Sequence, residues 1–574
     1  MGLYTKLPDR INEMDVIVAG AAGCIIASRL VEADRGLSVL VIESGKNNYH
    51  EPRVLHPAFW PSHIAPGNEF TQFYQGPESD HMAGRRGFVP TAQVLGGGSS
   101  INTALYSRAV RSDFDSWNMS GWSTEDVLPY MKKGSHQPGD AMTQLEVYHG
   151  PGPRDRHGYE GPMQISGGPF RSTRLENEFI AALGHVGWPE LEDNNDLDSV
   201  NGVMRAMRYI DPLGRRQDTA HMYLHPLLQD GDHPNLHVLV ETQVERVLPF
   251  SPRPMVPSPY LKLPERSEWS FLRGGPFGSP LLLERSGIGN PQVLDRAGIP
   301  LVASLPGVGH DYLDHHGMIY PYKSTLGPEE TMDALNSGRL DPATLIAKGD
   351  KLLGWNSVDA QAKLRPTDAG IAELGSEFQK AWERDFSQVP DKPLMMLSPF
   401  GGFPGDPSSI PAGQYFGMVA FSLHPYSRGH LHITGPNIDD PADFDPAVAS
   451  DHHGLDIKNH VWMYKKQREA ARRMEVYRGE VEGWHPSFPT SSQAYEAPSV
   501  YPLADVQDIE YSTDDDKIIE QWMRDHIDSI WHPMGTCKMG PLEERGSANC
   551  VNTAMTIAEK AADIFIQELG LRNK

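Results

Sequence analysis

The stretch that decides the fold is DVIVAGAAGCIIASRLVEADRGLSVLVIE, residues 15–43. It opens with the short apolar run DVIVA, typical of a buried strand, continues as GCIIASRLVEA, typical of a helix, and ends on a second strand, LSVLVIE. A strand, a helix and a strand near the start of a chain are the usual opening of a dinucleotide-binding domain. We therefore expect an α/β protein whose first domain is Rossmann-like.

The turn after the first strand carries Gly20 and Gly23, and Glu43 ends the second strand. A dinucleotide fold needs glycines where the backbone approaches the pyrophosphate, and an acid about 20 residues further on to hold the adenosine ribose. Glu43 has this spacing. Because only G-x-x-G remains of the G-x-G-x-x-G pattern, the turn alone leaves open a nucleotide site or a plain strand-to-helix connection.

Length and charge narrow the class of protein. A chain of 574 residues suggests two or more domains. Its 51 basic and 75 acidic residues give a net charge of −24, which repels phosphate backbones and anionic lipid. We therefore expect no nucleic-acid partner and no membrane partner.

The expected compartment is the cytoplasm. The three cysteines, Cys24, Cys537 and Cys550, offer no disulfide framework and suit a reducing interior. MGLYTKLPDRINEMD lacks the apolar core of a signal peptide, no apolar run approaches membrane-spanning length, and the last residues are not a Ser-Lys-Leu signal.

The rest of the chain alternates between loops and short elements. Residues 45–120 are expected to be rich in loops, residues 235–248 to be strand-like, and residues 457–476 to be helical. A final helix is expected to end at Gly570. Its predicted apolar face contains Ala554, Ile557, Ala558, Ala561 and Phe565.

Four further segments carry chemistry. The first is VLGGGSSIN, residues 94–102, whose bare amides and hydroxyls form a phosphate cradle if a helix follows, and a flexible loop otherwise. The others are GPFGSPLLLERSGIG at 275–289, LPGVGHDYLDHH at 305–316, and WHPMGT at 531–536 followed by NCVNTA at 549–554.

On these segments the chain resembles the glucose-methanol-choline (GMC) oxidoreductases over nearly its whole length, from Asp15 to Gly570. GRRQDTAHMYLHP at 214–226 and PYSRGHLHIT at 425–434 look most similar to the fungal alcohol oxidases of that family. The resemblance implies bound FAD and oxidation of a primary alcohol to an aldehyde, with dioxygen or another acceptor reoxidising the flavin. It implies no metal, and it allows a homo-oligomer.

The resemblance also assigns roles to residues. His532 would take the hydroxyl proton as a neutral imidazole while the carbinol hydride moves to flavin N5, and Asn549 would hold the same oxygen. The positions that it places at the cofactor are Gly20, Gly23, Glu43, Gly96, Gly97, Gly98, Ser99, Asn102, Val244 and Trp531.

The resemblance divides the chain into two interleaved domains. Residues 1–165, 215–315 and 525–574 would form a discontinuous FAD-binding domain. Residues 166–214 and 316–524 would form a substrate domain with an antiparallel sheet flanked by helices.

The chain departs from the family pattern in three places. The first glycine turn is short, Arg266–Pro276 stands where relatives have a buried strand, and His532 and Asn549 are unusually close in the sequence. These departures leave two alternatives to an active enzyme: a degraded, non-catalytic relative, or a mis-translated gene product that has lost FAD binding. A nicotinamide dehydrogenase is a more distant alternative, since it would not explain the Trp531–His532 motif.

Overall fold

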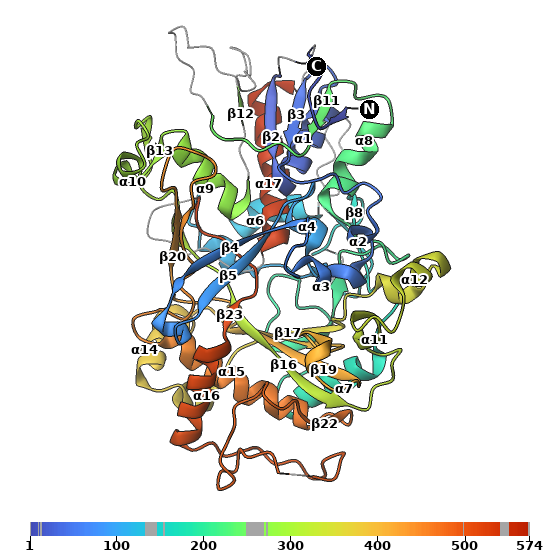
Figure 1. The fold of residues 1–574 in the computed structure, drawn as a ribbon, viewed down its shortest axis with the longest axis vertical. Helices are drawn as coiled ribbons and strands as arrows, with labels where there is room; N and C mark the ends of the chain where they lie inside the picture. Colours follow the sequence, from blue (N-terminus) through green and yellow to red (C-terminus); the bar gives the residue numbers. More distant parts are fainter. Residues whose placement is uncertain are drawn as a thin grey trace.

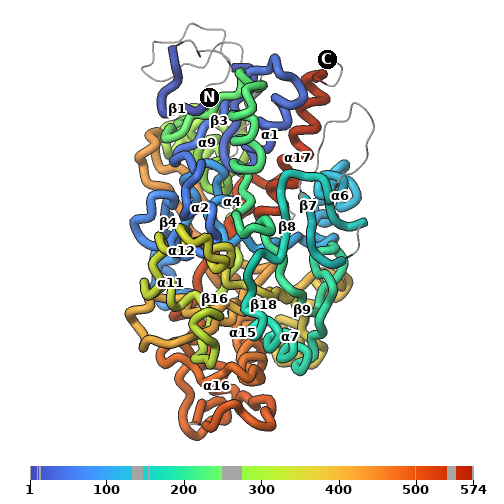
Figure 2. The backbone as a smooth tube through the Cα atoms, turned by 90° about the vertical axis from the view of Figure 1, so that its right-hand side faces the viewer, coloured from blue at the N-terminus to red at the C-terminus, as the bar shows by residue number. Residues whose placement is uncertain are grey.

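A computed structural model describes residues 2–9, 11, 14–132, 146–152, 155–247, 269–270, 274–497, 499–539 and 550–571. The chain forms a mixed α/β fold with a parallel sheet at one end and an antiparallel sheet at the other (Figure 1). Both termini lie at the parallel-sheet end, and α16 (Thr513–His526) lies at the opposite end (Figure 2). The predicted fold class is confirmed.

The parallel sheet contains the predicted βαβ unit. Its order is β1 (Leu3–Tyr4), β11 (Leu236–Leu239), β3 (Val39–Ile42), β2 (Val16–Ala19) and β12 (Trp269–Ser270). The helix α1 (Gly20–Ala33) joins β2 to β3, and all neighbouring strands run parallel. The side chains of β2 and β3 are almost fully buried, which is why both strands appear as unbroken apolar runs in the sequence.

Three expectations need correction. Residues 45–120 are not mainly loop, because β4 (Thr71–Glu78) and β5 (Arg86–Ala92) form a hairpin whose exposed polar positions conceal it in the sequence. Within the described residues 235–247, β11 is the only strand, since the chain leaves the sheet after Leu239. β12 pairs with β2 in the region where we expected the family's strand to be missing, although it is only two residues long.

The antiparallel sheet contains seven strands. Their order is β22 (Tyr477–Glu480), β16 (His316–Ser324), β19 (Tyr415–Ser422), β18 (Met395–Phe400), β17 (Ala360–Leu364) and β9 (Gly202–Arg205), with β23 (Asp528–Ser529) also paired to β16. The helices α7 (Thr173–His185), α15 (Leu455–Arg472) and α16 contribute apolar side chains to the same core as this sheet. A three-stranded sheet of β15 (His310–Tyr312), β20 (Gly429–His432) and β21 (Asp443–Asp445) lies beside the β4–β5 hairpin.

The C-terminal helix α17 (Cys550–Glu568) lies alongside α1 (Figure 1). It was predicted, and it ends before Gly570, but its most buried face is different from the predicted one. The fully buried apolar residues are Met555, Ala558, Ala562 and Ile566. On the predicted face Ala558 is buried and the other residues are only partly buried. The reason is that α1 packs against an adjacent face of α17. Among the described residues, no helix combines the length and apolarity needed to cross a bilayer.

Candidate active site

Two glycine turns predicted to bind the cofactor meet in space. Gly20 begins α1 with a φ of +70°, a conformation that favours glycine. A Cβ on Gly23 would lie 3.3 Å from the Val18 side chain, so this glycine lets α1 pack closely on β2. A Cβ on Gly97, whose φ is +55°, would lie 3.2 Å from the Ala21 amide nitrogen. The VLGGGSSIN loop therefore closes directly onto the first turn of α1.

The polar side chains of that loop hold the loop itself. Gly98 starts the short helix α4 (Gly98–Ile101), and Gly96 precedes it with a φ of +85°. The Ser99 hydroxyl donates to the Gly96 carbonyl at 2.6 Å. The side-chain amide oxygen of Asn102 accepts from the buried Arg216 guanidinium at 2.7 Å. The Ser99 hydroxyl and the Asn102 side-chain oxygen therefore fix the shape of the loop. The backbone of the loop is left to face a ligand.

Glu43 follows β3 and is 7% exposed. Its carboxylate accepts a hydrogen bond from the Gly45 amide at 2.8 Å, and burial raises the pKa of Glu43 to about 7. No cation pairs with it among the described residues, so it suits an uncharged donor such as a ribose hydroxyl. Val244 lies nearby in the fold, packed against the cluster that contains Ile42 and Leu239.

The segments 305–316 and 531–536 pair with each other. The Leu313 amide donates to the Met534 carbonyl at 2.9 Å, and the Met534 amide donates back at 2.8 Å. Gly535 has a φ of +92°, and a Cβ there would lie 2.2 Å from the Asp311 carbonyl oxygen. Only glycine allows this approach, which explains the glycine of WHPMGT.

This pairing brings His532 against His315. Their Nδ1 atoms lie 3.0 Å apart, and their rings meet edge to face. Burial lowers the pKa of His532 to about 4, and burial followed by the nearby His532 lowers that of His315 well below its usual value. Both imidazoles are therefore neutral at neutral pH. The ring of Phe421 lies 5.6 Å from each imidazole and supplies an apolar wall.

Sequence reasoning identified His532 but missed His315. The signal was present in the last residues of LPGVGHDYLDHH, but nothing local indicates which of its histidines meets His532.

Trp531 precedes His532 in an unusual conformation. Its φ is +68°, which is strained for a bulky side chain. Its indole Nε1 is buried without a hydrogen-bond partner among the described residues. Trp531 and Leu105 pack against the same apolar cluster, formed by Trp60, Val358 and Phe400. Because Leu105 follows the VLGGGSSIN loop, this cluster brings the predicted flavin loop close to the Trp531–His532 turn.

Asn549 lies outside the described residues. The first described turns of α17 nevertheless contain Asn552 and Thr553, both buried. Asn552 Nδ2 donates to the Tyr209 hydroxyl at 2.8 Å. The Asn552 Oδ1 and Thr553 Oγ1 atoms have no partner in the described part of the chain. The start of this helix therefore offers polar atoms to a ligand.

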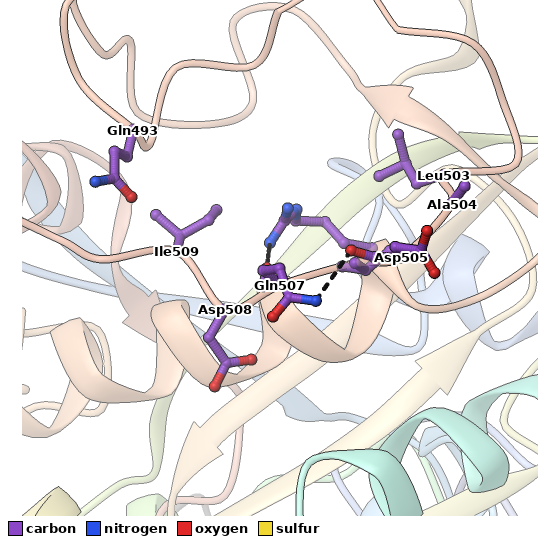
Figure 3. A pocket seen from close by; sticks show the side chains of 9 residues that line it. Gln493, Leu503, Ala504, Asp505, Gln507, Asp508 and Ile509 are labelled. Carbon is purple, nitrogen blue, oxygen red and sulfur yellow. Dashed lines mark hydrogen bonds between the residues drawn. The ribbon is translucent and has the colours of Figure 1, made fainter.

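One cavity that is open to solvent is not part of this site. It has a volume of about 320 Å³ and lies beside the segment Leu503–Ile509, with Arg472 and Gln493 also lining it (Figure 3). This segment precedes α16, at the end of the molecule away from α1 (Figure 2). None of the predicted site residues lines this cavity.

Comparison with known proteins agrees with this geometry. Two family models described as GMC oxidoreductase match residues 14–258 and 425–559. An alcohol oxidase of Candida boidinii is 33% identical and covers 97% of this chain and 96% of its own length. Alcohol oxidase 1 of Komagataella phaffii is 34% identical over 93% of this chain and 87% of its own length.

Solved structures share the fold. A formate oxidase superposes with a TM-score of 0.76 at 18% identity, covering 97% of this chain and 98% of its own. A fungal aryl-alcohol oxidase superposes with a TM-score of 0.72 at 22% identity, covering 97% of this chain and 99% of its own.

Proposed function

This chain belongs to the GMC oxidoreductase family, and we propose that it oxidises a small primary alcohol to the aldehyde with bound FAD and passes the electrons to dioxygen. The substrate gives up a hydride from its carbinol carbon and a proton from its hydroxyl, and dioxygen leaves as hydrogen peroxide. The observation that carries the proposal is the neutral, partly buried His532 held against His315.

The residues present fit FAD. The paired turns at Gly20 and Gly97 bring backbone close to the N-terminus of α1, where a pyrophosphate binds favourably. Glu43 offers a buried acceptor for ribose hydroxyls. The unpartnered Trp531 Nε1, Asn552 Oδ1 and Thr553 Oγ1 supply both a donor and acceptors for a large polar ligand. When bound, the flavin supplies the acceptor for the substrate hydride.

His532 would act as the base. A neutral imidazole that accepts a proton at Nε2 must carry its own proton on Nδ1. That Nδ1–H would donate to His315 Nδ1 at 3.0 Å, and we propose that His315, as the acceptor, keeps His532 in the tautomer that can serve as a base. Asn549, from its place in the family motif, would hold the substrate oxygen while the proton moves.

The choice of a short alcohol rests on the surroundings of His532 and on the relatives. The Phe421 ring packs against the imidazole and Trp531, the residue before it, packs into an apolar cluster, so the carbinol carbon would meet apolar surroundings. Proteins called alcohol oxidase match nearly the whole chain, which supports dioxygen as the acceptor. A degraded relative is not favoured, because the paired loops around His532 keep their hydrogen bonds.

The division into domains and the location of the protein are also proposals. We assign residues 1–165, 215–315 and 525–574 to FAD binding, supported by the parallel sheet, and residues 166–214 and 316–524 to the substrate domain. The pairing of β15 with β20 crosses this division. A cytoplasmic location is supported by the free thiol of Cys24, and sedimentation would decide whether the protein forms a homo-oligomer.

The test uses the purified full-length protein. We expect a yellow protein whose flavin is bleached by methanol or ethanol without oxygen and recovers its colour when air is admitted, with one hydrogen peroxide formed per aldehyde. Bleaching without recovery in air would make the enzyme a dehydrogenase. A colourless protein, or a flavin that no primary alcohol reduces, would refute the proposed function.

A further inference from the structure

The residue immediately before His315 also contacts the catalytic turn. Asp314 is 1% exposed, and its carboxylate accepts three hydrogen bonds. One oxygen accepts from the His532 amide at 2.8 Å. The other accepts from the Ser529 hydroxyl at 2.6 Å and from the Tyr312 hydroxyl at 2.9 Å. All three donors are uncharged, and no ion pair joins this carboxylate to a cation in the described part of the chain.

Ser529 extends this contact to the strained residue. While its hydroxyl donates to Asp314, its oxygen accepts from the Trp531 amide at 2.8 Å. The amides of Trp531 and His532 are thus both tied to one carboxylate, the first through Ser529 and the second directly. A tryptophan with a φ of +68° persists only where its surroundings enforce that conformation, and these hydrogen bonds do so.

A buried carboxylate is costly to desolvate and adds stability only through the bonds that it accepts. Here those bonds converge on the turn that carries His532. The next residue, His315, holds the imidazole of His532 through Nδ1. Two consecutive residues therefore hold the main chain and the ring of His532 separately.

We propose that Asp314 is a positioning residue for His532, acting with Ser529 to hold the Trp531–His532 turn in the conformation that aligns the imidazole with the substrate. The proposal rests on the proposed role of His532 as the base. It predicts that the rate of flavin reduction depends on how many hydrogen bonds the side chain at position 314 can accept. The affinities for FAD and for alcohol should not depend on this number.

The matched pair of variants is Asp314→Asn and Asp456→Asn. Asp456 is also buried, and its carboxylate also accepts from a serine hydroxyl, Ser427, at 2.6 Å and from the amides of Tyr426 and Ser427. It lies at the start of α15, and none of its hydrogen bonds in the described part of the chain reaches His532. An asparagine at 314 can still accept from the His532 amide, but its NH₂ group cannot accept from Ser529 and Tyr312.

We expect Asp314→Asn to keep FAD and an unchanged affinity for alcohol, and to slow flavin reduction by about 10–100-fold, since a displacement of 1 Å costs up to about that factor. Reoxidation of its reduced flavin by dioxygen should keep the wild-type rate. Asp456→Asn should lower the melting temperature to a similar extent and keep the wild-type rate of flavin reduction. If Asp314→Asn does not fold, Ser529→Ala takes its place, since it removes the hydroxyl that joins Asp314 to the Trp531 amide.

An unchanged rate of flavin reduction in Asp314→Asn or Ser529→Ala would overturn the proposal. An equal loss in Asp456→Asn would also overturn it, because the effect would then follow stability and not position. If the wild-type protein fails to reduce its flavin with any alcohol, the proposed function fails, and the proposal is decided by a crystal structure of Asp314→Asn. A Trp531–His532 turn that keeps its conformation in that crystal would refute it.

Discussion

The Nδ1 atoms of His315 and His532 lie 3.0 Å apart although 217 positions separate the two residues in the chain. Both rings are neutral, so one of them donates the single proton in this bond. With His315 as the acceptor, the proton of His532 sits on Nδ1, and Nε2 is the nitrogen that takes a substrate proton. In the mechanism that we propose, His315 is therefore the residue that sets the tautomer of the base.

The first prediction concerns His532. We expect His532→Ala to retain FAD and to lower the rate of flavin reduction by about 10²–10⁴-fold, the usual contribution of a general base. Rapid mixing with alcohol in the absence of oxygen measures this rate. His526→Ala, on the exposed end of α16, is the control and should behave like the wild type. Equal rates in the two variants would remove His532 from the mechanism.

The second prediction concerns pH. The base acts as a neutral imidazole, so its contribution is present above its pKa of about 4 and lost below it. Burial raises the pKa of Asp314 to about 7, and only the ionised form accepts all three of its hydrogen bonds. Flavin reduction should therefore accelerate in two steps as the pH rises. Asp314→Asn should lose the upper step and keep the lower one, whereas a rate that falls with rising pH contradicts this assignment.

The third prediction concerns FAD affinity. Without ligand, Glu43 has a pKa near 7, and ribose hydroxyls that donate to it would favour its ionised form. FAD should therefore bind more tightly as the pH rises towards about 7 and show no further change above it. We expect Glu43→Gln to weaken binding by about 10–100-fold, as for a hydrogen bond to a charged group, and to abolish the pH dependence. Titration of the FAD-free protein measures both effects, with the exposed Glu32→Gln as the control.

The fourth prediction concerns the packing of α1 on α17. The buried Glu559 carboxylate accepts from Arg29 Nε and Nη2 at 2.9 Å each and from the Tyr223 hydroxyl at 2.6 Å. Glu559→Ala would leave the buried guanidinium without this partner and should lower the free energy of unfolding by about 3–5 kcal/mol. Glu32→Ala removes a 43% exposed carboxylate from the same arginine and should cost no more than about 1 kcal/mol. Similar melting temperatures for the two variants would contradict the prediction.

Much of the framework is predictable from the sequence because its signals are local. The unbroken apolar runs around Val16 and Val39, with a helix-like segment between them, predict a βαβ unit from one short stretch of sequence. The last helix is also predictable from its sequence. Its buried face is not, because that face depends on where α1 lies. The β4–β5 hairpin was missed because its strands face solvent over much of their length.

The sequence by itself determined the family, the order of the motifs and the identity of His532 as the proposed base, because each is encoded in a short contiguous run of residues. Only the tertiary structure decided that His315 and Asp314 hold that base, and that the Asn102 side-chain oxygen accepts a hydrogen bond from Arg216. These contacts join residues more than 100 positions apart. The contacts of His315 and Asp314 with His532 exist because the loop that precedes β16 meets the loop that follows β23 in one register, and no local pattern of side chains specifies that register.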